Sequence, residues 1–161
     1  MTSLTWEYAS PDPSSGHQEA LAAFRCCKCV GFNRPWEHDV ETGIQGIVLP
    51  VADDERVLLG VTEEGKLGAV AWWWRRDPDR VKLLAVAVAL GLRRQGIGDA
   101  LVTETLDRMS IDTSGVEALQ VYGEVHTRNR ESREMCIRHR LELKGPVDRN
   151  YDVWAIDIDL T

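Results

Sequence analysis

The sequence has no long apolar segment, no excess of basic charge and no evenly spread set of cysteines. No apolar run approaches the roughly 20 residues that a membrane-spanning helix needs. The first ten residues, MTSLTWEYAS, contain no basic start followed by an apolar stretch, so we expect no signal peptide. Lysine and arginine total 19 against 26 aspartate and glutamate, a formal net charge of −7, which argues against a general nucleic-acid binder.

Only four cysteines are present, and three of them crowd at positions 26, 27 and 29. This spacing is unlike the disulfide framework of a small secreted protein, so we expect a cytoplasmic location. Cys26 and Cys29 form a Cys-x-x-Cys pair, but no second pair completes the four ligands of a zinc site, and His38 is only a remote candidate for a further ligand. A thioredoxin-like pair would need a βαβ setting that is missing. We therefore expect cysteines packed along a helix and no bound metal.

What is present fits one domain spanning residues 1–161 around one hydrophobic core. Of the 161 residues, 43% are hydrophobic and 28% are charged, which are ordinary proportions for a globular chain and argue against disorder. No internal repeat and no low-complexity tract divides the sequence.

Hydrophobic periodicity and turn residues predict a mixed α+β chain. Ser15 and Gln18 have the spacing of a capping box, which predicts a helix through about Cys29. Pro35 at a first helical position predicts a second helix over residues 33–44. The later elements are strands at 56–62 and 67–74 joined as an antiparallel hairpin, a central strand at 81–90, a helix at 96–109, a strand at 117–125, a helix at 129–140 and a final strand at 151–160.

The stretch LRRQGIGDAL, residues 92–101, joins the central strand to the following helix through a glycine-containing turn. Such a turn presents free backbone N–H groups at the positive end of a helix dipole, and Gly96 and Gly98 allow close approach of an anion. Arg93 and Arg94 add charge for phosphate oxygens. The dinucleotide and P-loop fingerprints both fit poorly. The turn is therefore suited to a pyrophosphate, and the alternative is a glycine-rich helix start beside exposed arginines.

The segment LAVAVALGLRRQGIGDALV resembles the acetyl-coenzyme A signature of the GNAT family of N-acetyltransferases. In that signature a strand is followed by Arg/Gln-x-x-Gly-x-Gly/Ala at the start of a helix, and Arg93, Gly96 and Gly98 fill it. Asn129 stands where the family has an asparagine after its fifth strand, and Ser132 takes the small position that follows. The order of elements and the chain length match as well.

The resemblance implies a mixed, mostly antiparallel sheet of about six or seven strands flanked by about four helices, with strands four and five parallel and splayed apart. It implies transfer of an acetyl group from acetyl-CoA to a primary amine of a small molecule or protein, by direct attack in a ternary complex. The pyrophosphate would lie on the amides of residues 94–99, and pantetheine would run beside Val86 and Val88, with the Val88 amide polarising the thioester carbonyl. The implied coenzyme-binding residues are Val86, Val88, Arg93, Arg94, Gln95, Gly96, Ile97, Gly98, Asp99, Asn129 and Ser132.

The catalytic residues are less clearly implied, because the sequence departs from the family pattern. Cys136 stands where the family usually has the tyrosine that protonates the leaving thiolate; it is a substitute acid, a thiol that is itself acylated, or an inert half-buried side chain. On the fifth strand, alternation places Tyr122, Glu124 and His126 on one face, where each is a candidate to relay a proton from an ammonium. Glu124 is our preferred base, and a solvated polar edge is the alternative.

Two further patterns stay open. Trp72, Trp73 and Trp74 either pack in the core or line a pocket for an apolar or aromatic amine; alternation separates Trp73 from the other two. The arginines between positions 128 and 140 either form a salt-bridged helix face with Glu131 and Glu134 or contact the adenosine 3′-phosphate or an acidic partner.

Two other functions compete with amine acetylation. The missing tyrosine suggests a catalytically weak acyl-CoA-binding regulatory module. The basic helix suggests a toxin-like acetyltransferase acting on charged tRNA, against which the acidic balance argues. We expect acetyl-CoA and an amine acceptor as partners and no membrane; the oligomeric state is open, a homodimer included.

Overall fold

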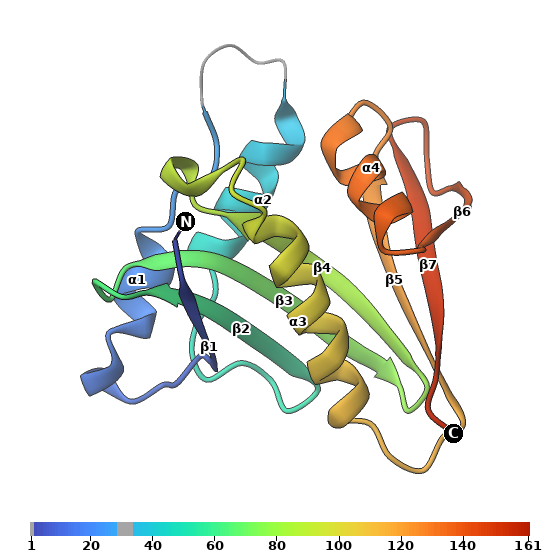
Figure 1. Ribbon diagram of the computed structural model, residues 1–161, viewed down its shortest axis with the longest axis horizontal. Helices are drawn as coiled ribbons and strands as arrows, with labels where there is room; N and C mark the ends of the chain where they lie inside the picture. Colours follow the sequence, from blue (N-terminus) through green and yellow to red (C-terminus); the bar gives the residue numbers. More distant parts are fainter. Residues whose placement is uncertain (1, 29–33) are drawn as a thin grey trace.

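The computed structural model describes residues 2–28 and 34–161, and its centre is a seven-stranded sheet in the order β1-β2-β3-β4-β5-β7-β6 (Figure 1). All neighbouring strands are antiparallel except β4 and β5, which are parallel. The strands are β1 Leu4–Tyr8, β2 Glu55–Thr62, β3 Leu67–Asp77, β4 Arg80–Val88, β5 Ala118–His126, β6 Glu142–Pro146 and β7 Tyr151–Asp159. The helices are α1 His17–Ala22, α2 Pro35–Gln45, α3 Ile97–Ile111 and α4 Arg130–Arg138, with 3-10 turns at Pro13–Ser15 and Leu90–Leu92.

Helices cover both faces of the central strands. Leu59 and its same-face neighbours pack against Leu21 and Ile44 of α1 and α2. Leu58 and its same-face neighbours pack against Leu101 and other residues of α3. Because successive side chains of a strand point to opposite faces, this double cover explains the near-continuous apolar runs of β2, β3 and β4. Among the described residues, no helix combines the length and apolar character needed to cross a membrane.

The parallel strands β4 and β5 pair over a short stretch and then separate. Their register runs only from Arg80 opposite Gln120 to Leu83 opposite Gly123. Beyond Leu83, β4 continues to Val88 beside β3, whereas β5 continues to His126 beside β7. Figure 1 shows the two strands diverging toward the end at which α4 lies. The predicted fold class, including the splayed parallel pair, is confirmed.

The predicted elements that follow the first helix are found within a few residues of their expected bounds. The predicted length of the first helix is wrong. The chain makes a 3-10 turn capped by Asp12, and α1 begins after Gly16, whose φ of 71° is left-handed. The capping box does not form, because the Gln18 amide instead donates to the Ile47 carbonyl and accepts from the Leu49 N–H, both at 2.8 Å. The helix ends at Ala22, and Cys29 lies outside the described residues.

Two strands were not predicted, and both lie at sheet edges. In β1, Leu4, Trp6 and Tyr8 alternate onto the face that α3 covers, a signal too short to separate from a loop. β6 is mostly exposed and ends on Pro146, so its sequence carries no core pattern. Among the three tryptophans, Trp73 is the buried one and packs in the cluster under α3.

Candidate active site

The backbone between β4 and α3 forms an exposed donor surface. Arg94 and Gly96 both have positive φ, 63° and 76°, so the chain turns sharply just before the helix. Gly96 is the N-cap of α3 and supplies no side-chain cap, which leaves the first helical N–H groups without that partner. The N-terminus of an uncapped helix attracts anions through these groups and the helix dipole.

A cavity of about 960 Å³ connects this turn with the opened ends of β4 and β5. Its walls come from the turn, the first part of α3, β4, the ends of β5 and β7, α4 and α2. It brings together every coenzyme-binding and catalytic candidate predicted above except two. Gln95 accepts a hydrogen bond from the Thr2 N–H at 3.4 Å, and Tyr122 accepts one from Arg76 at 3.3 Å, both away from the cavity lining.

Backbone groups of β4 face the opening. Ala89 donates its N–H to the Gly68 carbonyl at 2.8 Å, toward β3. Since N–H directions alternate along a strand, the amides of Val88 and Val86 point the other way, toward β5. The pairing of β4 with β5 ends at Leu83, so this edge is open to an extended ligand beside the turn.

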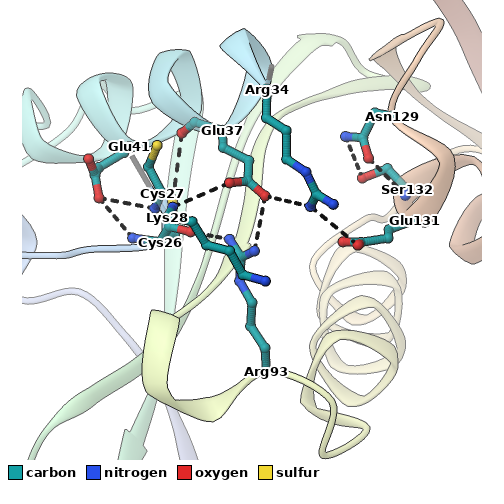
Figure 2. Close-up of polar contacts among 10 residues, drawn as sticks. All are labelled: Cys26, Cys27, Lys28, Arg34, Glu37, Glu41, Arg93, Asn129, Glu131 and Ser132. Atoms are coloured by element: carbon teal, nitrogen blue, oxygen red, sulfur yellow. Dashed lines mark hydrogen bonds and ion pairs between the residues drawn. The ribbon is translucent and has the colours of Figure 1, made fainter. Parts of the chain in front are cut away.

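The Arg93 side chain is tied to the opposite wall rather than to the turn (Figure 2). Its guanidinium pairs with Glu37 at 3.0 Å and donates to the Cys26 carbonyl. Arg34 also contacts Glu37, at 3.1 Å, and reaches Glu131 of α4 at 3.3 Å. Burial alone would raise the pKa of the Glu37 carboxyl, but the hydrogen bonds from Arg93 and Arg34 outweigh it and lower the pKa. The buried carboxylate therefore anchors the glycine turn to α2.

Asp99 lies in the first turn of α3, where a negative charge would repel an anion. Two basic side chains at the end of α4 offset this charge. The Asp99 carboxylate contacts Arg138 at 3.1 Å and His139 at 2.9 Å. Burial would raise the pKa of Asp99, but these two partners hold it below its ordinary value. The contact also joins the two helices whose N-terminal turns border the cavity.

Asn129 and Ser132 form the N-terminal cap of α4. The Asn129 Oδ1 accepts from the Ser132 N–H at 3.1 Å, and its Nδ2 donates to the Ser132 Oγ at 2.9 Å. Figure 2 shows the two side chains turned toward each other. Both line the cavity, and their mutual hydrogen bonds fix the start of the helix on which Cys136 lies.

Cys136 is half-buried in the cavity wall. Burial raises the pKa of its thiol to about 11, so the group keeps its proton at neutral pH. A protonated thiol is a poor nucleophile, because the thiolate is the reactive form. Its remaining chemical capacity is that of a proton donor.

The two acid–base candidates from β5 have different surroundings. Glu124 is partly exposed on the cavity wall and pairs with Lys82 at 3.4 Å. His126 is buried, and its Nδ1 accepts the backbone N–H of Arg128 at 3.1 Å, which leaves the proton of the neutral ring on Nε2. His126 must lose this hydrogen bond before its Nδ1 can accept a proton, whereas the Glu124 side chain lies on the cavity wall without such a backbone contact among the described residues.

An aromatic group at the same end of the cavity was not predicted from the sequence. The His126 ring lies 4.7 Å from the Trp36 ring and 5.1 Å from the Tyr151 ring, the latter edge-on. Tyr151 is paired with His126 across β5 and β7. Burial and the carboxylates of Asp39, Asp148 and Glu124 raise the pKa of Tyr151, so its hydroxyl is protonated. The cross-strand register brings Tyr151 to His126, and the packing of α2 adds Trp36; neither relation is visible in the pattern of a single segment.

Comparison with known proteins places this arrangement in a family. The sequence profile described as the acetyltransferase (GNAT) family matches residues 17–138. No sequence among curated proteins is significantly similar to the chain.

Solved structures show the same fold at low sequence identity. The ribosomal-protein-S18-alanine N-acetyltransferase of Escherichia coli has a TM-score of 0.66 and 16% identity, with 98% of this chain and 96% of that chain covered. Nourseothricin acetyltransferase has a TM-score of 0.64 and 16% identity, covering 98% and 99%. A GNAT-family acetyltransferase of Streptococcus pneumoniae has a TM-score of 0.61 and 13% identity, covering 96% and 99%. With the profile extending from α1 to the end of α4, the chain belongs to the acetyltransferase (GNAT) family.

Proposed function

We propose that the protein transfers an acetyl group from acetyl-CoA to a primary amine inside the cavity between β4 and β5. The observation that carries this proposal is one cavity that joins an uncapped helix N-terminus, an unpaired strand edge and a set of acid–base side chains. Its volume of about 960 Å³ lies within the range of ligand sites, near its upper end. Family membership supports the same chemistry.

In this proposal the turn and β4 bind the coenzyme. The amides of residues 94–99 receive the pyrophosphate, and Arg94 supplies a positive charge beside it. The strand edge at Val86 and Val88 receives the pantetheine arm, and the Val88 N–H stabilises the oxyanion that forms on the thioester carbonyl. Arg93 contributes through its tether to Glu37, which fixes the turn, rather than through direct contact with phosphate.

The chemical step is attack of a neutral amine nitrogen on the thioester carbonyl carbon. A C–N bond forms, the C–S bond breaks, and the amine loses a proton while the departing thiolate gains one. Glu124 is the proposed acceptor of the amine proton, directly or through water. Cys136 and water are the candidate donors to the thiolate, and the protonated hydroxyl of Tyr151 is a further donor in the same cavity.

The acceptor end favours a cationic amine that carries a flat apolar group. The rings of Trp36, His126 and Tyr151 lie close together there and offer apolar and cation–π contact. Asp39 and Glu124 line the same end; Lys82 pairs with Glu124 at 3.4 Å, and Asp39 adds a second carboxylate that attracts an ammonium group. An acidic acceptor would meet like charge.

Calorimetric binding of acetyl-CoA, followed by measurement of CoA release with an amine panel, tests the proposal. Tryptamine and tyramine should be acetylated faster than glutamate at equal concentration. Tight binding of acetyl-CoA with no acetylation of any amine would favour the acyl-CoA-binding regulatory module. Absence of acetyl-CoA binding would refute the proposal as a whole.

A further inference from the structure

Outside the cavity, three metal-ligating side chains meet on one side of α2. The Cys27 Sγ, a ring nitrogen of His38 and a carboxylate oxygen of Glu41 lie within 4.8 Å of one another. His38 and Glu41 are three residues apart on the helix and therefore share a face. Cys27 comes from the coil that precedes α2. None of the three lines the cavity, so the cluster is separate from the proposed active site.

The backbone around Cys27 is held against this helix face by the same glutamate. The Glu41 Oε1 accepts the N–H groups of Cys26 at 2.9 Å and Cys27 at 3.2 Å, and Figure 2 shows both contacts. Arg25 approaches this oxygen at 3.5 Å, but its side chain is 67% exposed and free to turn to solvent. The Oε2 atom has no hydrogen-bond partner among the residues that the structure describes. Glu41 thus has one oxygen for the backbone and one for a further ligand.

Sulfur, imidazole nitrogen and carboxylate oxygen are together the donor set of zinc. A thiolate disfavours magnesium and calcium, which take oxygen ligands, whereas zinc is bound by all three donor types. In a tetrahedral zinc site the ligand atoms lie roughly 3.3–3.7 Å apart. The cluster needs to contract by about 1 Å to reach that spacing. The exposed His38 side chain has the room to rotate inward.

We propose that Cys27, His38 and Glu41 form a Zn²⁺ site that clamps the coil before α2 onto that helix. Zinc binds the thiolate, so the Cys27 thiol proton is released to solvent when the metal enters. The zinc site would join the coil before α2 to that helix. Arg93 contacts the same two segments, at the Cys26 carbonyl and at Glu37. The sequence offers no second cysteine pair for zinc, but the fold brings a histidine and a carboxylate from one helix to Cys27.

The test uses the full-length, tag-free chain, reduced and freed of metal with a chelator, then titrated with Zn²⁺ or Co²⁺. At free Zn²⁺ a hundredfold above its Kd, Tm should rise by roughly 5–10 °C, because only the folded chain presents the site. Co²⁺ should give the near-ultraviolet charge-transfer band of a thiolate ligand. His38→Ala is the main variant: since His38 is exposed, the metal-free Tm should be unchanged while most of the Zn²⁺-induced shift is lost. Cys136→Ser is the matched thiol control and should keep both metal signals.

Cys27→Ser should lose the charge-transfer band, and Glu41→Gln should weaken Zn²⁺ binding. Because both side chains are buried, either variant can fail to fold, in which case His38→Ala decides the question. A Zn²⁺-induced Tm shift of equal size in His38→Ala and in wild type would overturn the proposal. So would a Co²⁺ complex without a thiolate band, or no Tm change with Zn²⁺.

Discussion

At the scale of single residues, the side chains around the cavity are of two kinds. Some line the cavity, and others hold its backbone in place through contacts with other side chains. Arg93 matches a signature position, yet its guanidinium is occupied by Glu37 and a carbonyl, so its contribution is the shape of the turn. Glu124 and Cys136, by contrast, line the cavity itself. The sequence predicted both kinds of residue by position but did not separate their roles, because the partner of Arg93 lies 56 residues away.

Replacing Cys136 by alanine should lower kcat/KM for a verified amine by less than about tenfold. A required proton donor typically contributes roughly 10²–10⁴-fold, but a thiol is shorter than the family phenol, and water and Tyr151 offer other protons. Steady-state rates of Cys136→Ala and Cys136→Tyr measure the effect. A loss beyond about a hundredfold in the alanine variant, with acetyl-CoA binding intact, would show that the thiol is the catalytic acid.

Glu124→Gln should reduce kcat/KM for the amine by about tenfold or more while the Kd of acetyl-CoA stays nearly constant. The amide keeps the size of the side chain but is not a base. Steady-state kinetics with calorimetry of acetyl-CoA binding separates the two effects. Wild-type turnover in this variant would transfer the base to His126 or to solvent.

At the scale of elements, apolar patterning located the helices and strands from β2 to β5 and the final strand, because each buries apolar side chains. The helix α2 was located from Pro35 at its start, and two of its three buried residues are glutamates. The first helix was overextended, since Ser15 and Gln18 show capping-box spacing whereas Gln18 actually bonds to the Ile47 and Leu49 backbone. That choice depends on a loop about thirty residues later, so no local pattern reveals it. The splay of β4 and β5 came from the family resemblance and not from periodicity.

The ion pair of Arg93 with Glu37, which links the glycine turn to α2, should contribute to the free energy of unfolding. Arg93→Met leaves the buried Glu37 with Arg34 and the Lys28 N–H as partners and should lower the free energy of unfolding by about 1–3 kcal/mol. Urea denaturation measures the change. Arg94→Met is the matched control, because Arg94 makes no ion pair with the described residues, and it should be nearly neutral. Equal stability of Arg93→Met and wild type would contradict the role given to the tether.

At the scale of the whole molecule, sheet topology produces the candidate site. A parallel pair that separates after four residue pairs opens a passage between the two halves of the sheet, with the turn at one end and the aromatic group at the other. The motif around Gly96 predicted the first end. Trp36 and Tyr151 lie on elements far apart in sequence, and each contacts His126 only in the folded chain, so the aromatic end of the passage was found from the structure.

The buried thiols should make the folded chain less stable in alkali. Burial raises the pKa of Cys26 to about 12 and that of Cys136 to about 11, whereas thiols of an unfolded chain ionise near about 8.5. The full stabilisation is therefore present below pH ~8 and falls as pH rises toward 11, because only the unfolded state loses these protons. Urea denaturation of the reduced protein at pH 8 and pH 10 should show the decrease, and Cys136→Ser should show a smaller one. Equal free energies of unfolding of the wild type at both pH values would contradict the burial of the Cys26 and Cys136 thiols.

The central claim is that the turn before α3 holds the phosphates of acetyl-CoA, and a thermal-shift titration tests it most directly. A Cβ at Gly98 would meet the Met135 Sδ at 3.6 Å and a Val88 methyl at 3.8 Å, which are ordinary contacts, and the two further methyl groups of a valine would crowd the turn. Gly91→Val is the matched control, since that position has open space and an ordinary φ. Acetyl-CoA should raise the Tm of wild type and Gly91→Val, and the shift should be lost in Gly98→Val. Undiminished acetyl-CoA affinity in Gly98→Val, with its ligand-free Tm near that of wild type, would contradict the account.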